Sequence, residues 1–402
     1  MKAKDYIELE QKYGAHNYHP LPVVISRAKG VWVWDVEGRK YLDFLASYSA
    51  VNQGHCHPRI RKAMVDQSAK VTLTSRAFRS DQLGLLYKQV SEMTGYRRML
   101  PMNSGAEAVE TAIKAARKWG YKVKGVPDGK AEILAFTGNF HGRTTTIVGF
   151  SEDEQYRDGF GPFTPGFRLL PYGDLEAIRR AMNPNVVAVL VEPIQGESGI
   201  NVPPAGYLRG IAEICKEHRA LFVADEIQSG MGRTGTFLSC ERSGVTPDIV
   251  TLAKGLANGL PLGAAVARDD VAAAFVPGTH GSTFGGNPVC CAAALSVMDV
   301  VTTPGFFGDV VRKGERFMSG LTAIAARRTD VREVRGAGLM VGLEMEGETK
   351  PVAARCLDAG LVVNAAAGNV LRFLPPLTVR DEEIDRALAI LAAVLPAEGR
   401  AA

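Results

Sequence analysis

Residues 207–225 read YLRGIAEICKEHRALFVAD, a helical stretch followed directly by a short apolar strand. Similar apolar strand segments occur at 131–136, 186–191, 249–253 and 262–267, and 105–119 is a further helical stretch. Strands that are apolar throughout and are separated by helices predict a parallel sheet covered on both faces. Ligands of such sheets bind outside the carboxyl ends of the strands. We therefore expect the functional site at that edge.

The two ends of the chain have a different pattern. Residues 31–44 predict a hairpin around Glu37-Gly38, and from about residue 309 a helix, a strand pair, another helix and more short strands follow. The sequence thus predicts an α/β protein with a large domain around a mostly parallel central sheet and a smaller α+β domain from both termini. The expected segments are 1–50 and 291–402 for the small domain and 51–290 for the large one.

Bulk composition narrows the class of protein. A net charge of +4 over 402 residues, with basic and acidic side chains mixed, gives no basic patch for nucleic acid. No apolar run reaches membrane-spanning length, and the first residues, MKAKDYIELEQKYG, lack the apolar core of a signal peptide. We expect a cytoplasmic protein that binds neither nucleic acid nor a membrane.

The six cysteines show no C-x-x-C spacing, so reduced and mostly buried thiols are expected. His55-Cys56-His57 superficially resembles a metal motif. Adjacent side chains diverge, however, and no second ligand cluster follows, so no metal site is expected.

Gly230-x-Gly232-x-x-Gly235 fits the glycine spacing of dinucleotide-binding turns, which raises the alternative of an NAD-dependent oxidoreductase. In such turns the first glycine follows the strand closely and a sustained helix begins within the motif. Here five residues, 225–229, separate the apolar strand LFVA (221–224) from the first glycine, the following TGTFLSCERSG is poor helix sequence, and no acid stands at the distance expected for the ribose. The pattern is better explained as a tight turn.

Three features at predicted strand ends suggest catalysis. Lys254 and Asp225 each end an apolar strand of the same sheet, and Ser104-Gly105 opens the helix 105–119, where free backbone N–H groups can bind phosphate. Burial disfavours a charged ammonium, as a Schiff-base lysine requires, and a buried Asp needs a cationic partner. Each feature taken alone also has a purely structural explanation. Lys254 could simply face solvent, Asp225 could stabilise a turn, and Ser104 could be an ordinary helix cap.

Six motifs occur in the order typical of class III aminotransferases, which use pyridoxal 5′-phosphate (PLP) on the fold-type-I scaffold: NSGAEAVETAIKAARKW, GNFHGRT, VEPIQGESGI, FVADEIQSGMGRTG, TLAKGLANGLPLGA and HGSTFGGNP. The chain resembles this family over nearly its whole length. The resemblance implies a PLP Schiff base on Lys254, with Asp225 at the pyridine nitrogen and Gln228 at the phenolic oxygen. It further implies a homodimer with shared active sites. The remaining implied cofactor contacts are phosphate binding by Gly105 and Ala106, ring stacking by Phe140, and completion of the neighbouring subunit's phosphate site by Ser282 and Thr283.

The N-terminal third, with GAHNYHPLPV (14–23), and the segment YRDGFGPFTPGF (156–167) resemble ornithine aminotransferases. These transfer the δ-amino group of L-ornithine to 2-oxoglutarate, giving glutamate-5-semialdehyde and glutamate. The resemblance implies that Tyr18 and Arg143 hold the ornithine α-carboxylate and that Tyr48 lines the pocket. It also implies an acid–arginine switch of Glu197 and Arg372, in which Glu197 neutralises Arg372 for ornithine and releases it for glutamate.

Some segments depart from that branch. His141 stands where ornithine aminotransferases often carry tryptophan, and HGRT and the tail LVVNAAAGNVLRFLPPLTV are more similar to acetylornithine aminotransferases. An acetylornithine aminotransferase is therefore the alternative, followed by activity on lysine or 4-aminobutyrate. A non-catalytic homologue would be expected to have lost Lys254 or Asp225, and both are present.

Overall fold

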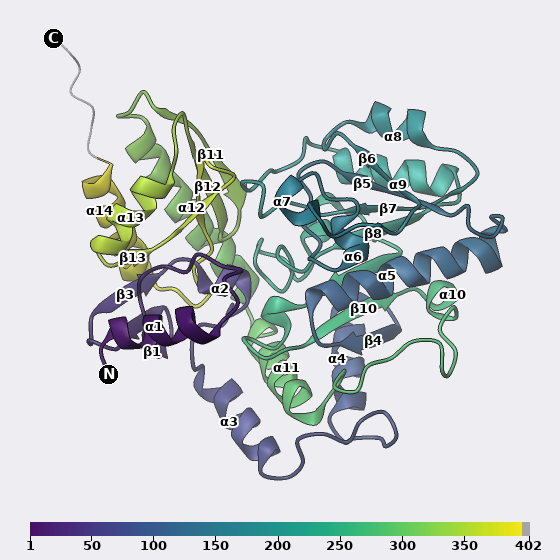
Figure 1. Ribbon diagram of the computed structural model, residues 1–402, viewed down its shortest axis with the longest axis horizontal. Helices are drawn as coiled ribbons and strands as arrows, with labels where there is room; N and C mark the ends of the chain where they lie inside the picture. Colours follow the sequence, from purple (N-terminus) through teal and green to yellow (C-terminus); the bar gives the residue numbers. More distant parts are fainter. Residues whose placement is uncertain (396–402) are drawn as a thin grey trace.

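The computed structural model describes residues 1–395, whose strands form three sheets (Figure 1). The central sheet has seven strands. In spatial order they are β4 (Arg98–Met102), β10 (Gly263–Ala267), β9 (Ile249–Leu252), β8 (Leu221–Asp225), β7 (Val186–Val191), β5 (Glu132–Phe136) and β6 (Phe167–Leu170).

The central sheet is mostly parallel, as predicted, with one exception. Strands β9, β8, β7, β5 and β6 pair in parallel, whereas β10 runs antiparallel to both β9 and β4. A parallel crossover needs about a dozen residues or more, usually with a helix. The connection 253–262 between β9 and β10 is shorter and holds only the 3₁₀ turn η3 (Lys254–Leu256), so the chain reverses direction there. The expectation of a parallel strand at 262–267 is thus corrected.

Helices cover both faces of this sheet because its strands are apolar on both. In β8, Leu221 and Val223 face the core shared with α5, while Phe222 and Ala224 face the core of α8 and α9. The helices of this part are α3 (Pro58–Ser68), α4 (Leu83–Thr94), α5 (Gly105–Trp119), α6 (Thr145–Val148), α7 (Glu154–Arg157), α8 (Leu175–Ala181), α9 (Tyr207–Glu217), α10 (Asp269–Ala272) and α11 (Pro288–Val301), with a π turn at Gly120–Lys124 and a 3₁₀ turn at Ser239–Ser243.

The smaller part of the molecule joins segments from both ends of the chain, seen in Figure 1 as purple and yellow-green ribbons side by side. One sheet pairs β1 (Ile25–Lys29), β2 (Trp32–Asp35) and β3 (Lys40–Asp43) with β13 (Leu361–Val362); the other has the order β11 (Val331–Ala337), β12 (Met340–Met345), β15 (Val370–Phe373), β14 (Asn364–Ala366). The helices here are α1 (Ala3–Tyr13), α2 (Ala46–Ser49), α12 (Phe306–Ala325), α13 (Lys350–Asp358) and α14 (Asp381–Val394). Leu42 and Phe44 pack with Phe317 and Phe373 in one core, which unites the two ends.

The predicted fold class is confirmed, including the hairpin at 31–44, where Trp32 lies opposite Leu42. The final helix α14 was not predicted. The domain boundaries stay a prediction: α11 spans the proposed boundary at residue 290 and packs on α3 and α4, and residues 396–402 lie outside the described part. Among residues 1–395 no single helix is both long and apolar enough to cross a membrane, and one bent pair, α11 with α12, passes by length and composition only.

Candidate active site

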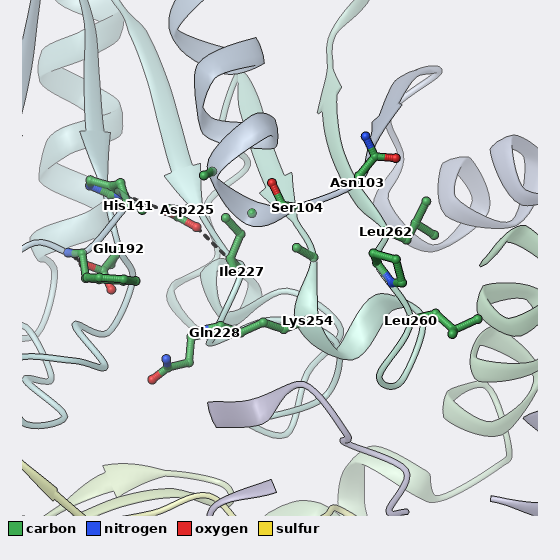
Figure 2. Close-up of a pocket in the computed structure, with 16 residues that line it drawn as sticks. Asn103, Ser104, His141, Glu192, Asp225, Ile227, Gln228, Lys254, Leu260 and Leu262 are labelled. Atoms are coloured by element: carbon green, nitrogen blue, oxygen red, sulfur yellow. Dashed lines mark hydrogen bonds and ion pairs between the residues drawn. The ribbon is translucent and has the colours of Figure 1, made fainter. Parts of the chain in front are cut away.

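A cavity of about 260 Å³ lies at the carboxyl ends of the central parallel strands (Figure 2). Asp225, the last residue of β8, and Lys254, two residues after β9, both line it. The first turn of α5 forms another wall, through Ser104, Gly105 and Ala106. The structure thus brings together the lysine, the acid and the helix N-terminus that the sequence placed at one edge of the sheet.

Lys254 is held in a left-handed backbone conformation, with φ of 44°, which directs the chain sharply out of β9. Burial lowers the pKa of its ammonium group. The negative charge of Glu197 opposes this shift, and the positive charge of Arg372 adds to it. The amine is therefore easier to deprotonate than an exposed lysine, as nucleophilic or proton-transfer chemistry requires.

Asp225 is buried and makes three hydrogen bonds. Its Oδ2 lies 2.6 Å from His141 Nδ1, and its Oδ1 accepts bonds from Thr251 Oγ1 at 3.0 Å and the Ile227 amide at 3.1 Å. Burial alone would lower the pKa of His141, but the hydrogen bond and charge of Asp225 outweigh burial and raise it. The sequence showed His141 only as a departure from a family pattern and carried no signal that it pairs with Asp225.

Glu192 is a second buried acid of the cavity that sequence reasoning missed. Its Oε1 accepts the Phe140 amide at 2.8 Å, and its Oε2 accepts the Gly196 amide at 3.4 Å. Burial raises the pKa of this carboxyl to about 7, partly offset by the charge of His141. A signal was available, since Glu192 directly follows the apolar strand β7, as Asp225 ends β8.

The N-terminus of α5 is preorganised for an anion. Ser104 caps the helix through a bond from the Glu107 amide, and Glu107 accepts the Ser104 amide in return, at 3.2 and 3.0 Å. The amides of Gly105 and Ala106 at the first helical positions have no partner within the helix. Side-chain space is limited here, because a Cβ on Gly105 would lie 3.0 Å from Ile227 Cδ1. Backbone N–H groups at such a terminus suit a phosphate.

A second cavity, of about 570 Å³, shares Phe140 and Lys254 with the first. Its wall contains every residue predicted for substrate binding, from five separate parts of the chain: Tyr18, Tyr48, Arg143, Glu197 and Arg372. The two cavities therefore meet at the lysine.

Arg143 sits among aromatic rings rather than acids. It donates to the hydroxyls of Tyr18 and Tyr156, each at 3.2 Å, and stacks over the ring of Tyr156 at 4.7 Å and of Phe140 at 5.5 Å. Within residues 1–395 no carboxylate pairs with Arg143. Tyr156 was not predicted as a site residue.

Arg372 and Glu197 form a two-point ion pair, with contacts of 2.8 and 3.0 Å. Burial works against the charged form of Glu197, yet Arg372 outweighs burial and lowers the pKa of Glu197 to about 2. The side chain of Gln228 donates to Glu197 Oε1 at 2.9 Å. Asn364, not identified from the sequence, accepts from Arg372 at 2.8 Å, and the ring of Tyr48 lies 5.3 Å from the guanidinium.

Ser282 and Thr283 are not among the wall residues of either cavity. Ser282 Oγ accepts a bond from Asn103 Nδ2 at 2.7 Å, and Thr283 is exposed. Their role in a neighbouring subunit stays a prediction.

Elsewhere, all six cysteines are free and Cys56 alone is exposed, while His55 pairs with Asp43 at 2.7 Å.

Comparison with known proteins decides the family. The model of the family described as aminotransferase class-III matches residues 13–395. This chain is a class-III aminotransferase. It is 49% identical over 395 residues to the ornithine aminotransferases of Brevibacillus brevis (strain 47) and Bacillus subtilis (strain 168), covering 98% of this chain and of each relative.

Solved structures agree with this assignment. The class-III aminotransferase superposes on the ornithine aminotransferase of Toxoplasma gondii ME49 with a TM-score of 0.96 and 41% identity, covering 98% of this chain and 95% of that one. The acetylornithine aminotransferase of Elizabethkingia anophelis is also similar, with a TM-score of 0.89, 40% identity, and coverage of 98% and 99%.

Class-III aminotransferases depend on PLP, and the residues of the first cavity fit that cofactor. The two free backbone amides at the start of α5 suit its phosphate. The buried Asp225 suits a protonated ring nitrogen. The buried Lys254, whose pKa is lowered, suits its aldehyde. The site therefore fits the phosphate, the ring nitrogen and the aldehyde of the cofactor.

The buried Glu192 predicts a specific pH dependence of stability. Its pKa is raised from 4.5 to about 7 in the folded state, so the folded protein binds this proton more tightly than the unfolded chain. The stabilisation is complete below pH 4.5 and is lost as pH rises through about 7. At 1.36 kcal/mol per pKa unit the loss is about 3 kcal/mol.

Glu192→Gln, which stays neutral, should therefore show a flatter decline in melting temperature between pH 4.5 and 8 than the wild type. Scanning calorimetry of the holoenzyme over this range measures the difference. Glu213→Gln, at an exposed position, is the matched control. Parallel curves for wild type and Glu192→Gln would contradict the raised pKa.

Proposed function

We propose that this protein is an ornithine aminotransferase, transferring the δ-amino group of L-ornithine to 2-oxoglutarate to give glutamate-5-semialdehyde and glutamate. The observation that carries this proposal is that two arginines of one cavity differ in whether a carboxylate pairs with them. Within the described residues 1–395, the hydrogen-bond partners of Arg143 are tyrosine hydroxyls and not carboxylates, so its charge is available to a substrate carboxylate. Arg372 is neutralised by Glu197, which spares a cationic substrate from an unpaired positive charge.

Ornithine matches this arrangement from end to end. Its α-carboxylate would lie between Tyr18 and Arg143, which places the distal amine toward Lys254 at the junction of the two cavities. Tyr156, bonded to Arg143, would help to hold that carboxylate anchor in place. For the second half-reaction, Glu197 would move away and free Arg372 for the α-carboxylate of glutamate. The names of the relatives at 49% identity support the same substrate.

Residues of the first cavity would hold the cofactor. Lys254 would bind its aldehyde carbon, Asp225 its ring nitrogen, Gln228 its phenolic oxygen, and the amides of Gly105 and Ala106 its phosphate. The ring of Phe140 would lie against the cofactor ring. When bound, PLP supplies an electron-withdrawing ring that stabilises negative charge on the reacting carbon. Asp225, which is hydrogen-bonded to His141, would keep the ring nitrogen protonated.

Lys254 would also move the proton. Lys254 Nζ, at the junction of the two cavities, would face the carbon that bears the substrate amine, and its lowered pKa favours the unprotonated, basic form. Holding the substrate carboxylate at Arg143 fixes the distance to this base, which converts a bimolecular proton transfer into an oriented one.

A homodimer with shared active sites is part of the proposal, with Ser282 and Thr283 completing the phosphate site of the partner subunit. A cytoplasmic location is proposed with it. The similarity to the Elizabethkingia anophelis enzyme and the presence of His141 favour an acetylornithine aminotransferase as the second candidate.

Substrate preference tests the proposal. With 2-oxoglutarate as acceptor, kcat/KM for L-ornithine should exceed that for N-acetyl-L-ornithine by at least about tenfold, equivalent to about 1.4 kcal/mol of transition-state stabilisation. A preference for the acetylated amine would instead establish the second candidate.

Tyr18→Phe should raise KM for ornithine by about tenfold or more, because a hydrogen bond to a charged group contributes about 1.5–3 kcal/mol. The half-reaction with glutamate should change less than about twofold, since its carboxylate would lie at Arg372. Single-turnover kinetics with each amino acid separate the two effects. Tyr13→Phe, at an exposed position, serves as the control. Equal losses in both half-reactions would remove Tyr18 from the ornithine site.

A further inference from the structure

The glycine turn at residues 230–235 buries an arginine that neither cavity uses. Arg233 has no exposed surface, and its neighbours Gly232 and Gly235 have φ of 90° and 91°, in the left-handed region that favours glycine. A Cβ on Gly235 would lie 2.4 Å from Val311 Cγ2, so the turn fits tightly against α12. The motif that resembles a dinucleotide turn thus places a guanidinium between the two parts of the molecule.

All four hydrogen bonds of Arg233 go to neutral acceptors. Its Nε donates to Ser49 Oγ at 2.9 Å, its Nη2 to Asn52 Oδ1 at 2.7 Å, and its Nη1 to the carbonyls of Leu339 and Pro375 at 2.8 and 2.6 Å. Burial lowers the pKa of Arg233 to about 9. Burying a cation without a paired carboxylate costs folding free energy, so these four hydrogen bonds are needed to stabilise the guanidinium.

One of these acceptors, Ser49, belongs to a segment with unusual backbone, and Asn52 follows that segment three residues later. Residues Ala46 to Ser49, α2, all have positive φ, from 45° to 71°, which makes α2 a single left-handed turn. Such a conformation costs roughly 1–2 kcal/mol per residue for L-amino acids and persists only when its surroundings hold it. At its start, Asp43 Oδ1 accepts the amides of Leu45 and Ala46 at 2.9 and 3.0 Å. At its end, Ser49 is held by Arg233.

The left-handed turn carries Tyr48 into the larger cavity. Tyr48 lines that cavity, and its ring lies 5.3 Å from the guanidinium of Arg372. The adjacent Ser49 Oγ lies 3.2 Å from the carbonyl oxygen of Gln228 and 3.0 Å from Asn52 Oδ1. Tyr48 is therefore one residue away from a network that joins the left-handed turn to the loop after β8.

We propose that Arg233 is a positioning residue for the amino substrate: through Ser49 and Asn52 it holds the left-handed turn that presents Tyr48 to the substrate cavity. This role does not depend on which amino acid is the preferred donor. Release of the turn would let Ala46–Ser49 relax to ordinary backbone and withdraw the Tyr48 ring from Arg372. The reacting atoms at Lys254 would be affected less than substrate binding.

Kinetics of Arg233→Lys, Ser49→Ala, Tyr48→Ala and their double variants test this role in the holoenzyme. Lysine keeps the buried charge but lacks the planar fork that reaches four acceptors. Arg233→Lys and Ser49→Ala should each raise KM for the amino donor by about tenfold with kcat within about threefold. Each should add less than about twofold to KM in the Tyr48→Ala background, because residues acting through one another are non-additive. Arg209→Lys, at an exposed position, is the matched control.

The opposite pattern would overturn the proposal. If the KM effect of the double variant equals the product of the two single effects, or if kcat falls with KM unchanged, Arg233 does not act through Tyr48. Should Arg233→Lys fail to fold, Ser49→Ala decides the question, since it removes the hydroxyl that links Arg233 to the left-handed turn and leaves the other three acceptors of Arg233 in place.

Discussion

Lys254→Ala is expected to lower kcat for transamination by at least about 10⁴-fold, the upper end of what a positioned acid–base group contributes. The variant loses both the amine that would bind the cofactor and the only base proposed for proton transfer. Burial lowers the pKa of this amine, so the wild-type lysine loses its proton more readily than an exposed lysine does. Stopped-flow absorbance of the amino-donor half-reaction measures the loss directly.

Two further observations accompany this result. Borohydride treatment of the cofactor-loaded wild type, followed by peptide mass mapping, should leave the mass of the cofactor on Lys254. Lys130→Ala, at an exposed loop position, should retain wild-type activity and map identically. Residual turnover above about 1% in Lys254→Ala, or modification of a different lysine, would contradict the assignment.

Asp225→Asn is expected to lower kcat by about 10²- to 10⁴-fold. The substitution preserves shape but removes the charge that would keep the cofactor nitrogen protonated and that raises the pKa of His141. Removal of one partner of a buried ion pair costs about 3–5 kcal/mol, and each 1.36 kcal/mol corresponds to a factor of ten in rate. His141 should titrate at a lower pH in the variant, since burial lowers its pKa and only the charge of Glu192 would still oppose that shift.

Cofactor retention gives a second readout besides activity. Asp225→Asn should lose PLP during gel filtration under conditions in which the wild type and the exposed-site control Asp128→Asn retain it. Ring-proton NMR of histidine follows the shift at His141. Wild-type retention together with an unchanged His141 titration would show that Asp225 does not pair with the cofactor or with the imidazole.

Much of the site could be predicted because it rests on local patterns. Apolar runs followed by Asp225 or Lys254 located both residues at strand ends, and parallel strands bring their carboxyl ends to one edge. The cap sequence around Ser104 marked the start of α5 in the same way. Periodicity of two or 3.6 residues is a property of short segments, so it survives in the sequence alone.

Other features required contacts between distant segments. The direction of β10 depends on the connection after β9, which is too short for a parallel crossover and reverses the chain. The hydrogen-bond partner of Asp225 comes from a loop 84 residues earlier. Nothing local to His141 indicates that its Nδ1 faces a carboxylate. The left-handed turn at Tyr48 contains no glycine, so the sequence does not predict its backbone conformation. Contacts with Asp43 at one end and Arg233 at the other stabilise the turn.

The sequence by itself determined the alternation of strands and helices, the lysine and the acid at the sheet edge, and the family resemblance. Each of these features can be recognised from a short continuous segment of the chain. The pairing of Arg372 with Glu197 was already implied by that resemblance. Tertiary structure alone decided the surroundings of the other charged groups. It placed His141 against Asp225, left Arg143 among hydroxyls and rings, and surrounded Arg233 with neutral acceptors. Pairing energies fall steeply with distance and rise with burial, and both quantities exist only once segments far apart in the chain have packed together.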